Sequence, residues 1–222
     1  MKYILVLSAF FSSWIATAQE DPYIWMEEVE SEKSLEWVNH QNQLTKEKIS
    51  KIEGFNELQH RFEEVYNDKD KIVYPSTIGE FVYNFWKDDT HKRGIWRRTK
   101  RSDFLSGNYT WETILDIDAL SEKEGKKWVF HGANWLEPDY ATCLISLSDG
   151  GTDENEVREF DVTSKSFVKD GFFLPSSKGS ASWITKDELL VSRTSGEGTM
   201  TTSGYPRIVK RLKRGQKLNE AS

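Results

Sequence analysis

The spacing of apolar residues changes once along the 222-residue chain, close to residue 70. Before that point apolar side chains recur at helical spacing in two stretches, which Glu53-Gly54 separates. Two short helices, each with one apolar side, need another surface to cover that side. We therefore expect a helical leader over residues 19–70. The apolar positions are Leu35, Val38, Leu44, Ile49 and Ile52 in the first, looser stripe and Phe55, Leu58, Phe62 and Val65 in the second.

From residue 71 onward apolar residues alternate with polar ones or form short runs between Asp- and Gly-rich turns. The segment 81–86 is apolar on both faces, which is typical of a strand buried on both sides. Short strands joined by such turns, without long helices, predict an all-β sandwich, barrel or propeller. The segment 135–140 resembles the turn that opens many propeller blades, and so favours a propeller over residues 71–222. Further strands are expected at 94–99, 113–116, 141–147, 156–162, 182–184 and 189–192.

The first 18 residues have the pattern of a secretory signal peptide. Lys2 gives a positive start, residues 3–15 are mostly apolar, and Ala16-Thr17-Ala18 fits a cleavage site. The apolar run is shorter than the roughly 20 residues that span a bilayer, which favours cleavage over a membrane anchor. No cysteine near the site could carry a lipid. We expect an exported protein, periplasmic or secreted, that begins at Gln19 and has no membrane attachment after cleavage.

Composition agrees with a globular domain rich in sheets. Hydrophobic residues make up 37% and charged residues 30%, which excludes a disordered or membrane-embedded chain. The 9 Trp residues suit pleated sheets, where large flat side chains pack well. The net charge of -6 and the export signal speak against nucleic acid as the partner of the basic segment 92–101. Alternation places Arg97 and Arg98 on opposite faces of a strand, so at least one should pair with a carboxylate or face solvent.

Several stretches resemble the N-terminal region of the prolyl oligopeptidase family, in the order in which that family carries them. The opening stretch, with Trp37-Val38 and Gln41-Asn42 after it, is similar to the first helices of the family. The longest and most specific block falls within residues 128–161. The matching stretches are DPYIWMEE at 21–28, GIWRRT at 94–99, WVFHGAN at 128–134, SLSDGG at 146–151, VREFD at 157–161 and SGYPRIV at 203–209.

This resemblance implies a mainly β fold, an incomplete propeller with the first blades of an expected seven after a short α-helical leader. In the family an α/β-hydrolase domain holds the catalytic Ser, Asp and His, and the propeller caps that site and admits only peptides. The resemblance thus implies gating of oligopeptide substrates for a serine-type endopeptidase whose catalytic domain is absent from these residues. Because propeller blades cover one another's sheets, we expect a fragment of a longer product or a truncated remnant. The alternative is a stand-alone exported module that binds a peptide or glycan.

The residues themselves offer no catalytic site. The nucleophile elbow of such hydrolases is Gly-x-Ser-x-Gly, because its sharp turn tolerates only small flanking residues. That motif does not occur, and Gly179-Ser180-Ala181-Ser182, with Trp183 where a glycine is needed, is interpreted as a loop before a strand. We assign no histidine to catalysis. The four are His40 and His60 on the leader helices, His91 in a polar turn and His131 in the block that resembles the family.

No cofactor or metal site is expected either. The loop Asp149–Glu156 is acidic, but it lacks the alternating ligands and terminal Glu of an EF-hand, so we interpret it as a solvated blade turn. The loop Gly196–Met200 lacks the Lys-Ser/Thr pair and the following helix of a phosphate-binding loop. Cys143 lies in an apolar strand, where a small core residue is favoured over a reactive thiol.

Overall fold

The computed structural model describes residues 21–68, 70 and 72–222. The expected signal peptide, residues 1–18, lies outside them. The chain divides into two compact units, residues 1–61 and 62–222, and each is described by itself. No helix of the described residues is long and apolar enough to cross a membrane.

The leader is helical, as the sequence predicts. A 3-10 helix, Ile24–Glu27, precedes α1 (Glu32–Ile49), and α2 (Phe55–Asn67) follows. Between the two long helices Gly54 has φ +81°, a conformation that favours glycine and ends the helical run. Ile52 lies in this turn and not on α1, so its place in the predicted helical stripe is wrong.

The start of α1 is fixed by its N-cap. The Ser31 side-chain oxygen accepts a hydrogen bond from the Ser34 N–H at 3.2 Å, which satisfies one of the free donors at the helix start. Most apolar side chains of the leader are exposed, among them Leu35, Val38 and Phe62. The leader therefore presents apolar surface that its own helices do not cover.

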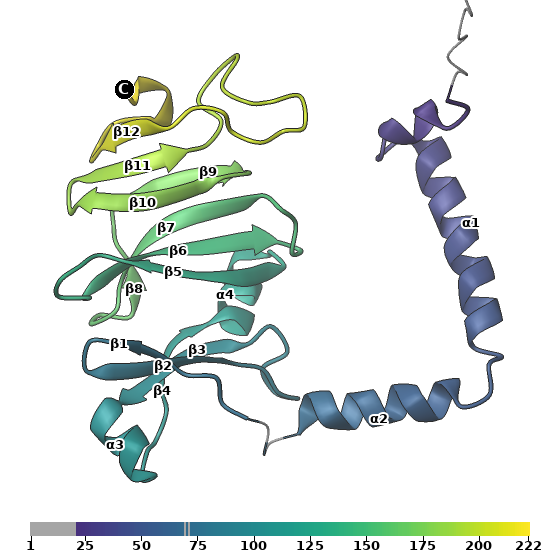
Figure 1. Ribbon diagram of the computed structural model, residues 1–222, viewed down its shortest axis with the longest axis horizontal. Coiled ribbons are helices and arrows are strands. Elements are labelled where there is room, and N and C mark those ends of the chain that lie inside the picture. Colours follow the sequence, from purple (N-terminus) through teal and green to yellow (C-terminus); the bar gives the residue numbers. More distant parts are fainter. Residues whose placement is uncertain (1–20, 69, 71) are drawn as a thin grey trace, which may run out of the picture. The chain divides into compact units, whose positions relative to one another are not determined.

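Three antiparallel sheets follow within residues 62–222 (Figure 1). In the first and third sheets, strands that follow one another along the chain are hydrogen-bonded neighbours, and in the second sheet the last two strands both pair with the strand before them. The first sheet consists of β1 (Ser76–Ile78), β2 (Phe81–Trp86), β3 (Ile95–Lys100) and β4 (Glu112–Asp116). The second consists of β5 (Trp128–Trp135), β6 (Thr142–Asp149), β7 (Asn155–Asp161), β8 (Ser166–Phe167) and β9 (Phe173–Ser177). The third consists of β10 (Ser180–Thr185), β11 (Glu188–Ser192) and β12 (Lys210–Lys213), and a 3-10 helix, Leu218–Glu220, follows it.

The outer strand of the second sheet is interrupted. Both β8 and β9 pair with β7, and the chain leaves the sheet between them. At the interruption Glu159 of β7 bonds to Phe172 twice: its N–H donates to the Phe172 carbonyl, and its carboxylate accepts from the Phe172 N–H. This irregularity brings a carboxylate into the interior of the sheet stack.

The three sheets stack face to face, so the second sheet is covered on both sides (Figure 1). Strand β6 shows this most clearly. Its residues Cys143, Ile145 and Leu147 belong to the apolar cluster shared with the first sheet, while Leu144 belongs to the cluster shared with the third. Because neighbouring residues of a strand point to opposite faces, a strand between two sheets buries apolar residues on both faces, as Cys143 to Ile145 do in β6.

One of the turn interpretations is wrong. The segment 135–140, which the sequence assigns to the opening of a blade, joins β5 to β6 within the second sheet. The second sheet begins earlier, at Trp128. The same turn chemistry serves any tight connection between strands, and a local motif does not show which pair of strands it joins.

Two short helices were not predicted: α3 (Arg101–Ser106) and α4 (Ile117–Glu124). Helix α4 begins at Asp116, whose side chain accepts a hydrogen bond from the Ala119 N–H at 2.9 Å, and ends at Gly125 with φ +65°. Both capping signals are present in the sequence. The sequence pattern did not predict this helix because it has only eight residues and lies between two strands.

Candidate functional site

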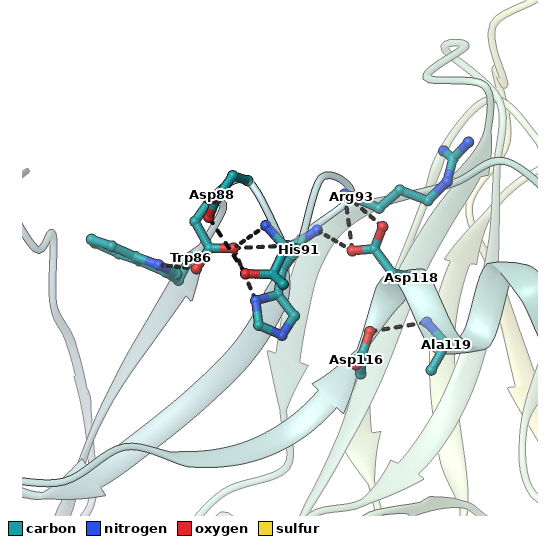
Figure 2. A network of polar contacts seen from close by, with 10 residues as sticks. Trp86, Asp88, His91, Arg93, Asp116, Asp118 and Ala119 are labelled. Atoms are coloured by element: carbon teal, nitrogen blue, oxygen red, sulfur yellow. Dashed lines mark hydrogen bonds and ion pairs between the residues drawn. The ribbon is translucent and has the colours of Figure 1, made fainter. Parts of the chain in front are cut away.

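The connection between β2 and β3, residues 87–94, is organised by the carboxylate of Asp88 (Figure 2). This carboxylate accepts hydrogen bonds from the Trp86 indole N–H at 2.9 Å, and from the His91 backbone N–H at 2.7 Å and ring Nδ1 at 3.0 Å. Burial alone would raise the pKa of Asp88, but these bonds and one from the Thr90 N–H outweigh it and hold the pKa well below its ordinary value. Asp88 is therefore a fixed negative charge that orients the Trp86 ring.

A second carboxylate, that of Asp118, fixes the end of the same connection (Figure 2). It accepts the backbone N–H groups of Arg93, at 3.0 and 3.1 Å, and of Gly94, at 3.0 Å. Gly94 has φ +105°, and a Cβ there would lie 2.5 Å from the Phe85 ring, so this position requires glycine. Strand β3 thus begins at a defined place relative to α4, which carries Asp118.

Arg97 and Arg98 lie on opposite faces of β3, as predicted from their alternation. Arg98 faces the second sheet beside Tyr83, and its Nε donates to the Glu112 carboxylate at 2.7 Å. Arg97 lies opposite Asn84 on the other face, and its Nε donates to the Asn84 side-chain oxygen at 3.0 Å. The expectation that at least one of the two arginines pairs with a carboxylate or faces solvent is confirmed by Arg98, which pairs with Glu112.

The Arg97 guanidinium also contacts two indole rings. Its Cζ lies 4.3 Å from the centre of the Trp86 ring and 4.5 Å from that of Trp111. Burial lowers the pKa of Arg97, because removing the guanidinium from water disfavours its charged form, and the charge of Asp88 partly offsets this. Cation–π contact with two rings holds the guanidinium in place without neutralising it.

A cavity of about 840 Å³ lies beside these residues, along β1, β2 and β5. Strand β1 pairs with residues 81–83 of β2 only, and β2 extends beyond it from Asn84 onward along this cavity. Its volume falls in the range of small-molecule and peptide pockets. The cavity is lined mainly by aromatic side chains, including Tyr83, Phe85, Trp86, Phe130 and Trp135.

The four histidines lie where the sequence places them. His40 is on α1, His60 on α2, and His91 in the polar connection after β2. The sequence did not reveal the partner of His131: its Nε2 lies 2.7 Å from the Ser148 hydroxyl oxygen. Ser148 is 1% exposed and lies within β6, so this pair lacks the exposed, sharply turned serine of a hydrolase. We assign it a structural role.

The segment closest to a nucleophile elbow, Gly179–Ser182, is the connection from β9 to β10 followed by that strand, in agreement with its interpretation as a loop before a strand. A Cβ on Gly179, which has φ +121°, would lie 1.9 Å from the Ser192 carbonyl oxygen. Glycine is therefore required here by close backbone approach.

Cys143 is fully buried in β6, and burial raises the pKa of its thiol, so the prediction of a core residue is confirmed. The acidic loop joins β6 to β7 in one sheet, and Asp149 at its start binds the Lys127 N–H at 2.8 Å. The loop Gly196–Met200 lies between β11 and β12. Among the described residues no three His, Cys, Asp or Glu side chains are grouped to hold a metal ion.

Antiparallel sheets of consecutive strands, stacked face to face, are the blades of a β-propeller. The fold class is therefore mainly β, with the first blades of a propeller after a short helical leader. Residues 12–220 match the family described as the prolyl oligopeptidase N-terminal beta-propeller domain. The chain belongs to this family.

The relatives and solved structures that this chain matches are much longer than the chain itself. It is 43% identical over 202 residues to the uncharacterized peptidase y4nA of Sinorhizobium fredii, covering 90% of this chain and 28% of the relative. Among solved structures, a post-proline cleaving enzyme from Rickettsia typhi is similar at 32% identity and a TM-score of 0.81, over 89% of this chain and 30% of that enzyme. Oligopeptidase B from Leishmania major, at 16% identity and a TM-score of 0.68, shares the fold over 92% of this chain and 28% of its own. The chain spans between 20% and 28% of the length of the curated relatives it matches.

Proposed function

We propose that this chain is the propeller part of an exported serine peptidase of the prolyl oligopeptidase type, and that it controls which peptides reach a catalytic domain outside these residues. The observation that carries the proposal is the 32% identity to the post-proline cleaving enzyme from Rickettsia typhi, over 89% of this chain. The same match covers only 30% of that enzyme, which leaves room for a separate catalytic domain.

The proposed reaction is hydrolysis of a peptide bond, with a preference for bonds after proline. It requires a serine nucleophile, a histidine base within hydrogen-bond reach and a third group that orients the base. The one Ser–His contact recorded among the described residues, between Ser148 and His131, involves a buried serine. We therefore assign the catalytic residues to the part of the protein outside this sequence.

The architecture of a propeller supports the proposed gating role. Blades arranged around a central channel leave an opening that an extended peptide can enter and a folded protein cannot. In this proposal the stacked sheets of residues 62–222 form part of the channel wall, and the exposed apolar residues of α1 and α2 pack on the catalytic domain. The partners are thus an oligopeptide substrate and the missing hydrolase domain.

Export is proposed from the first 18 residues alone. Expression of the full chain, followed by mass spectrometry of the periplasmic and secreted fractions, tests it. A mature N-terminus at Gln19 is expected. Recovery of the uncleaved chain in the cytoplasm or the membrane would overturn the export proposal and leave the family assignment unaffected.

Peptide cleavage tests the enzymatic part. The purified 222-residue chain should not hydrolyse a prolyl chromogenic peptide, whereas a longer product of the same reading frame should cleave that peptide but not the same sequence inside a folded protein. Turnover by the chain alone that persists in preparations cleared of contaminating peptidases would contradict the proposal. A continued reading frame without Gly-x-Ser-x-Gly, Asp and His would contradict it too.

A second candidate is a stand-alone exported module that binds a peptide or glycan, which the aromatic cavity of about 840 Å³ favours. Circular dichroism and a thermal melt of the isolated chain separate this candidate from a non-functional remnant. A cooperative melt of a β-rich protein supports a stable module, whereas a spectrum of an unfolded chain supports a remnant.

A further inference from the structure

The aromatic cavity along β1, β2 and β5 is lined by two indole rings whose N–H groups make no hydrogen bond within the described part of the chain. These are the indoles of Trp96 and Trp135. The indoles of Trp86, Trp128 and Trp183, in contrast, each donate to an oxygen at 2.8 to 3.0 Å. A donor removed from water without a partner is unfavourable, so the two unpaired indoles are available to a ligand.

The Trp96 donor opens into this cavity. Trp96 is 5% exposed, and Arg193 Nε is the one side-chain polar atom of the described residues that is fully buried without a partner. The Trp96 indole N–H is therefore not fully buried, and the cavity is the open space that its side chain lines. The Trp96 ring centroid lies 5.2 Å from that of Tyr83 and 5.5 Å from those of Phe130 and Trp135. These mutual contacts fix the donors before a ligand binds.

The cavity lies on the side of the sheets that a complete ring leaves open. Strands β1 and β5 are the first strands of their sheets, and each is an end strand. Strand β5 approaches β10, the first strand of the third sheet, so closely that the Trp183 indole donates to the Asn134 carbonyl. In a propeller the sheets converge at their innermost strands, around a central channel. These contacts indicate that the first strands, and the cavity along them, face the channel.

The polar groups of the wall favour a ligand with many acceptors and few donors. Among the described residues that line the cavity, Lys87 is the one that is charged, and none is a carboxylate. The Asn84 side chain is already used: its oxygen accepts from Arg97 Nε, and its amide donates to the Tyr74 carbonyl. A ligand N–H would thus find few acceptors, whereas a ligand carbonyl would find two indole donors beside a positive charge. The complementary ligand is apolar and rich in carbonyl oxygens.

A proline-containing peptide has this chemistry. Proline has no backbone N–H, so it enters an apolar site without leaving a donor unsatisfied. In the polyproline II conformation the backbone has no internal hydrogen bonds, so its carbonyl oxygens are free to accept. Aromatic-lined grooves are a common kind of site at which proteins bind such segments.

We propose that the cavity binds a proline-containing segment of a peptide in the polyproline II conformation, and that the Trp96 and Trp135 indoles donate to its carbonyl oxygens. The proposal rests on the proposed function in one respect, that peptides enter the channel. The site holds the segment without cleaving it, and it is separate from the catalytic residues, which we place outside this sequence.

Isothermal titration of the purified 222-residue chain tests this with two uncharged probes of equal length, acetyl-hexaproline amide and acetyl-(Ala-Ser)₃ amide. The hexaproline should bind. The Ala-Ser peptide should bind at least about tenfold more weakly, because it lacks the rings and brings N–H groups that the wall does not satisfy. In NMR spectra of the chain labelled with ¹⁵N, hexaproline should move two indole N–H resonances to lower field as they gain an acceptor. Maltohexaose is the third probe, for a glycan.

Two variants assign the binding to the cavity. Trp135→Phe keeps a ring but removes one indole donor, and it should weaken binding of hexaproline about fivefold. Its control is Trp111→Phe, at an indole that contacts Arg97 and does not line the cavity. Tyr74→Ala removes an aromatic wall that is 79% exposed, so the fold should be retained while binding weakens about tenfold. Tyr23→Ala, at an exposed tyrosine of the leader, is its control, and both controls should bind as the parent chain does.

Equal affinity for the two peptides, unchanged binding by Tyr74→Ala, or no detectable binding of hexaproline would each overturn the proposal. Tighter binding of maltohexaose than of hexaproline would overturn it in favour of a glycan site. If the isolated chain is unfolded, a longer product with its serine nucleophile changed to alanine is titrated instead, and Tyr74→Ala in that protein separates the cavity from the catalytic site.

The titration involves no cleavage, so its outcome is distinguishable from that of the chromogenic assay. Cleavage by the longer product without binding of hexaproline to the cavity would overturn this proposal alone. Binding to the cavity without cleavage by the longer product would overturn the proposed function alone.

Discussion

The second sheet packs against its two neighbours in different ways. The interface with the first sheet is rich in aromatic residues: Trp96 contacts the rings of Tyr83, Phe130 and Phe160, with centroids 5.2 to 6.2 Å apart. The interface with the third sheet is mainly aliphatic, with Leu144, Val157, Leu174, Leu189, Val191 and Leu212 buried in it.

Charged groups enter the second of these interfaces. The Glu159 carboxylate is 6% exposed and receives two bonds from Arg214, at 2.7 and 3.1 Å. Arg193, 2% exposed, donates to the Pro175 and Ser177 carbonyls at 2.9 and 3.1 Å, and burial lowers its pKa to about 10. Large rings can fix how two sheets pack by shape alone. Small aliphatic side chains fit in more than one way, and directed hydrogen bonds across the interface then help to select one arrangement.

The largest effect is expected from Trp96→Ala in the aromatic interface. Trp96 is 5% exposed, and its removal leaves a cavity among the rings of Tyr83, Phe130, Trp135 and Phe160, which should lower the free energy of unfolding by about 3–5 kcal/mol. Urea denaturation measures the loss. Cys143, fully buried in the same interface, gives a second readout, because its labelling by a thiol reagent should become faster. A loss under about 1 kcal/mol with unchanged labelling would contradict the role given to this interface.

Glu159→Gln should act on the other interface. It removes the charge that Arg214 contacts and should lower the free energy of unfolding by about 2 kcal/mol, less than for a fully buried pair because Arg214 is partly exposed. Cys143 labelling in the native state should change less than in Trp96→Ala. An equal rise in labelling by both variants would show that the two interfaces open together.

Acid should weaken a contact at the border of the aromatic interface. Hydrogen bonds from Arg158, at 2.7 and 2.8 Å, and from the Trp128 indole lower the pKa of Glu124. Because the folded pKa lies below the unfolded one, the stabilisation is complete above the unfolded pKa and is lost as pH falls through the folded value.

Glu124→Gln should therefore lose about 1 kcal/mol at pH 7 and show a smaller further loss between pH 5 and pH 3 than the parent chain. Thermal melts across this range measure both. A parallel pH dependence of the variant and the parent would rule out this contribution of Glu124.

The smallest effect is expected from Lys165→Gln. Lys165 pairs with Glu112 at 2.7 Å, but both side chains are more than a third exposed, so water screens the pair. The free energy of unfolding should stay within about 0.5 kcal/mol of the parent value. A loss of unfolding free energy as large as that of Glu159→Gln would mean that this exposed ion pair stabilises the fold as much as the buried Glu159–Arg214 pair does.

Much of the fold was readable from local pattern. The helical spacing of apolar residues in the leader, the alternation at 81–86 and the apolar run after residue 141 each act within a few residues. Strands β1, β5, β8, β9 and β12 were not predicted. Strands β1 and β8 have only three and two residues, and β8 and β9 exist only as partners of β7. Length does not explain β5, which has eight residues. The turn at 135–140 was recognised, but its place inside a sheet depends on which strands pair.

For the candidate site, the sequence predicted only that Arg97 lies on a strand, on the opposite face from Arg98. The contacts of Arg97 with Trp86 and Trp111 depend on how the strands pair. The two tryptophans are 25 residues apart in the sequence, so the sequence does not show that they lie close together. Likewise, the sequence showed the acidic character of Asp88 and Asp118 but not that both fix one connection.

By itself the sequence determined the helical leader, the β class and the family, because each follows from spacing and motifs along the chain. Only the tertiary structure decided which face of each strand is buried and which charges are paired. The physical reason is that pairing and burial depend on distances between residues far apart in the chain, and those distances are set when the sheets stack.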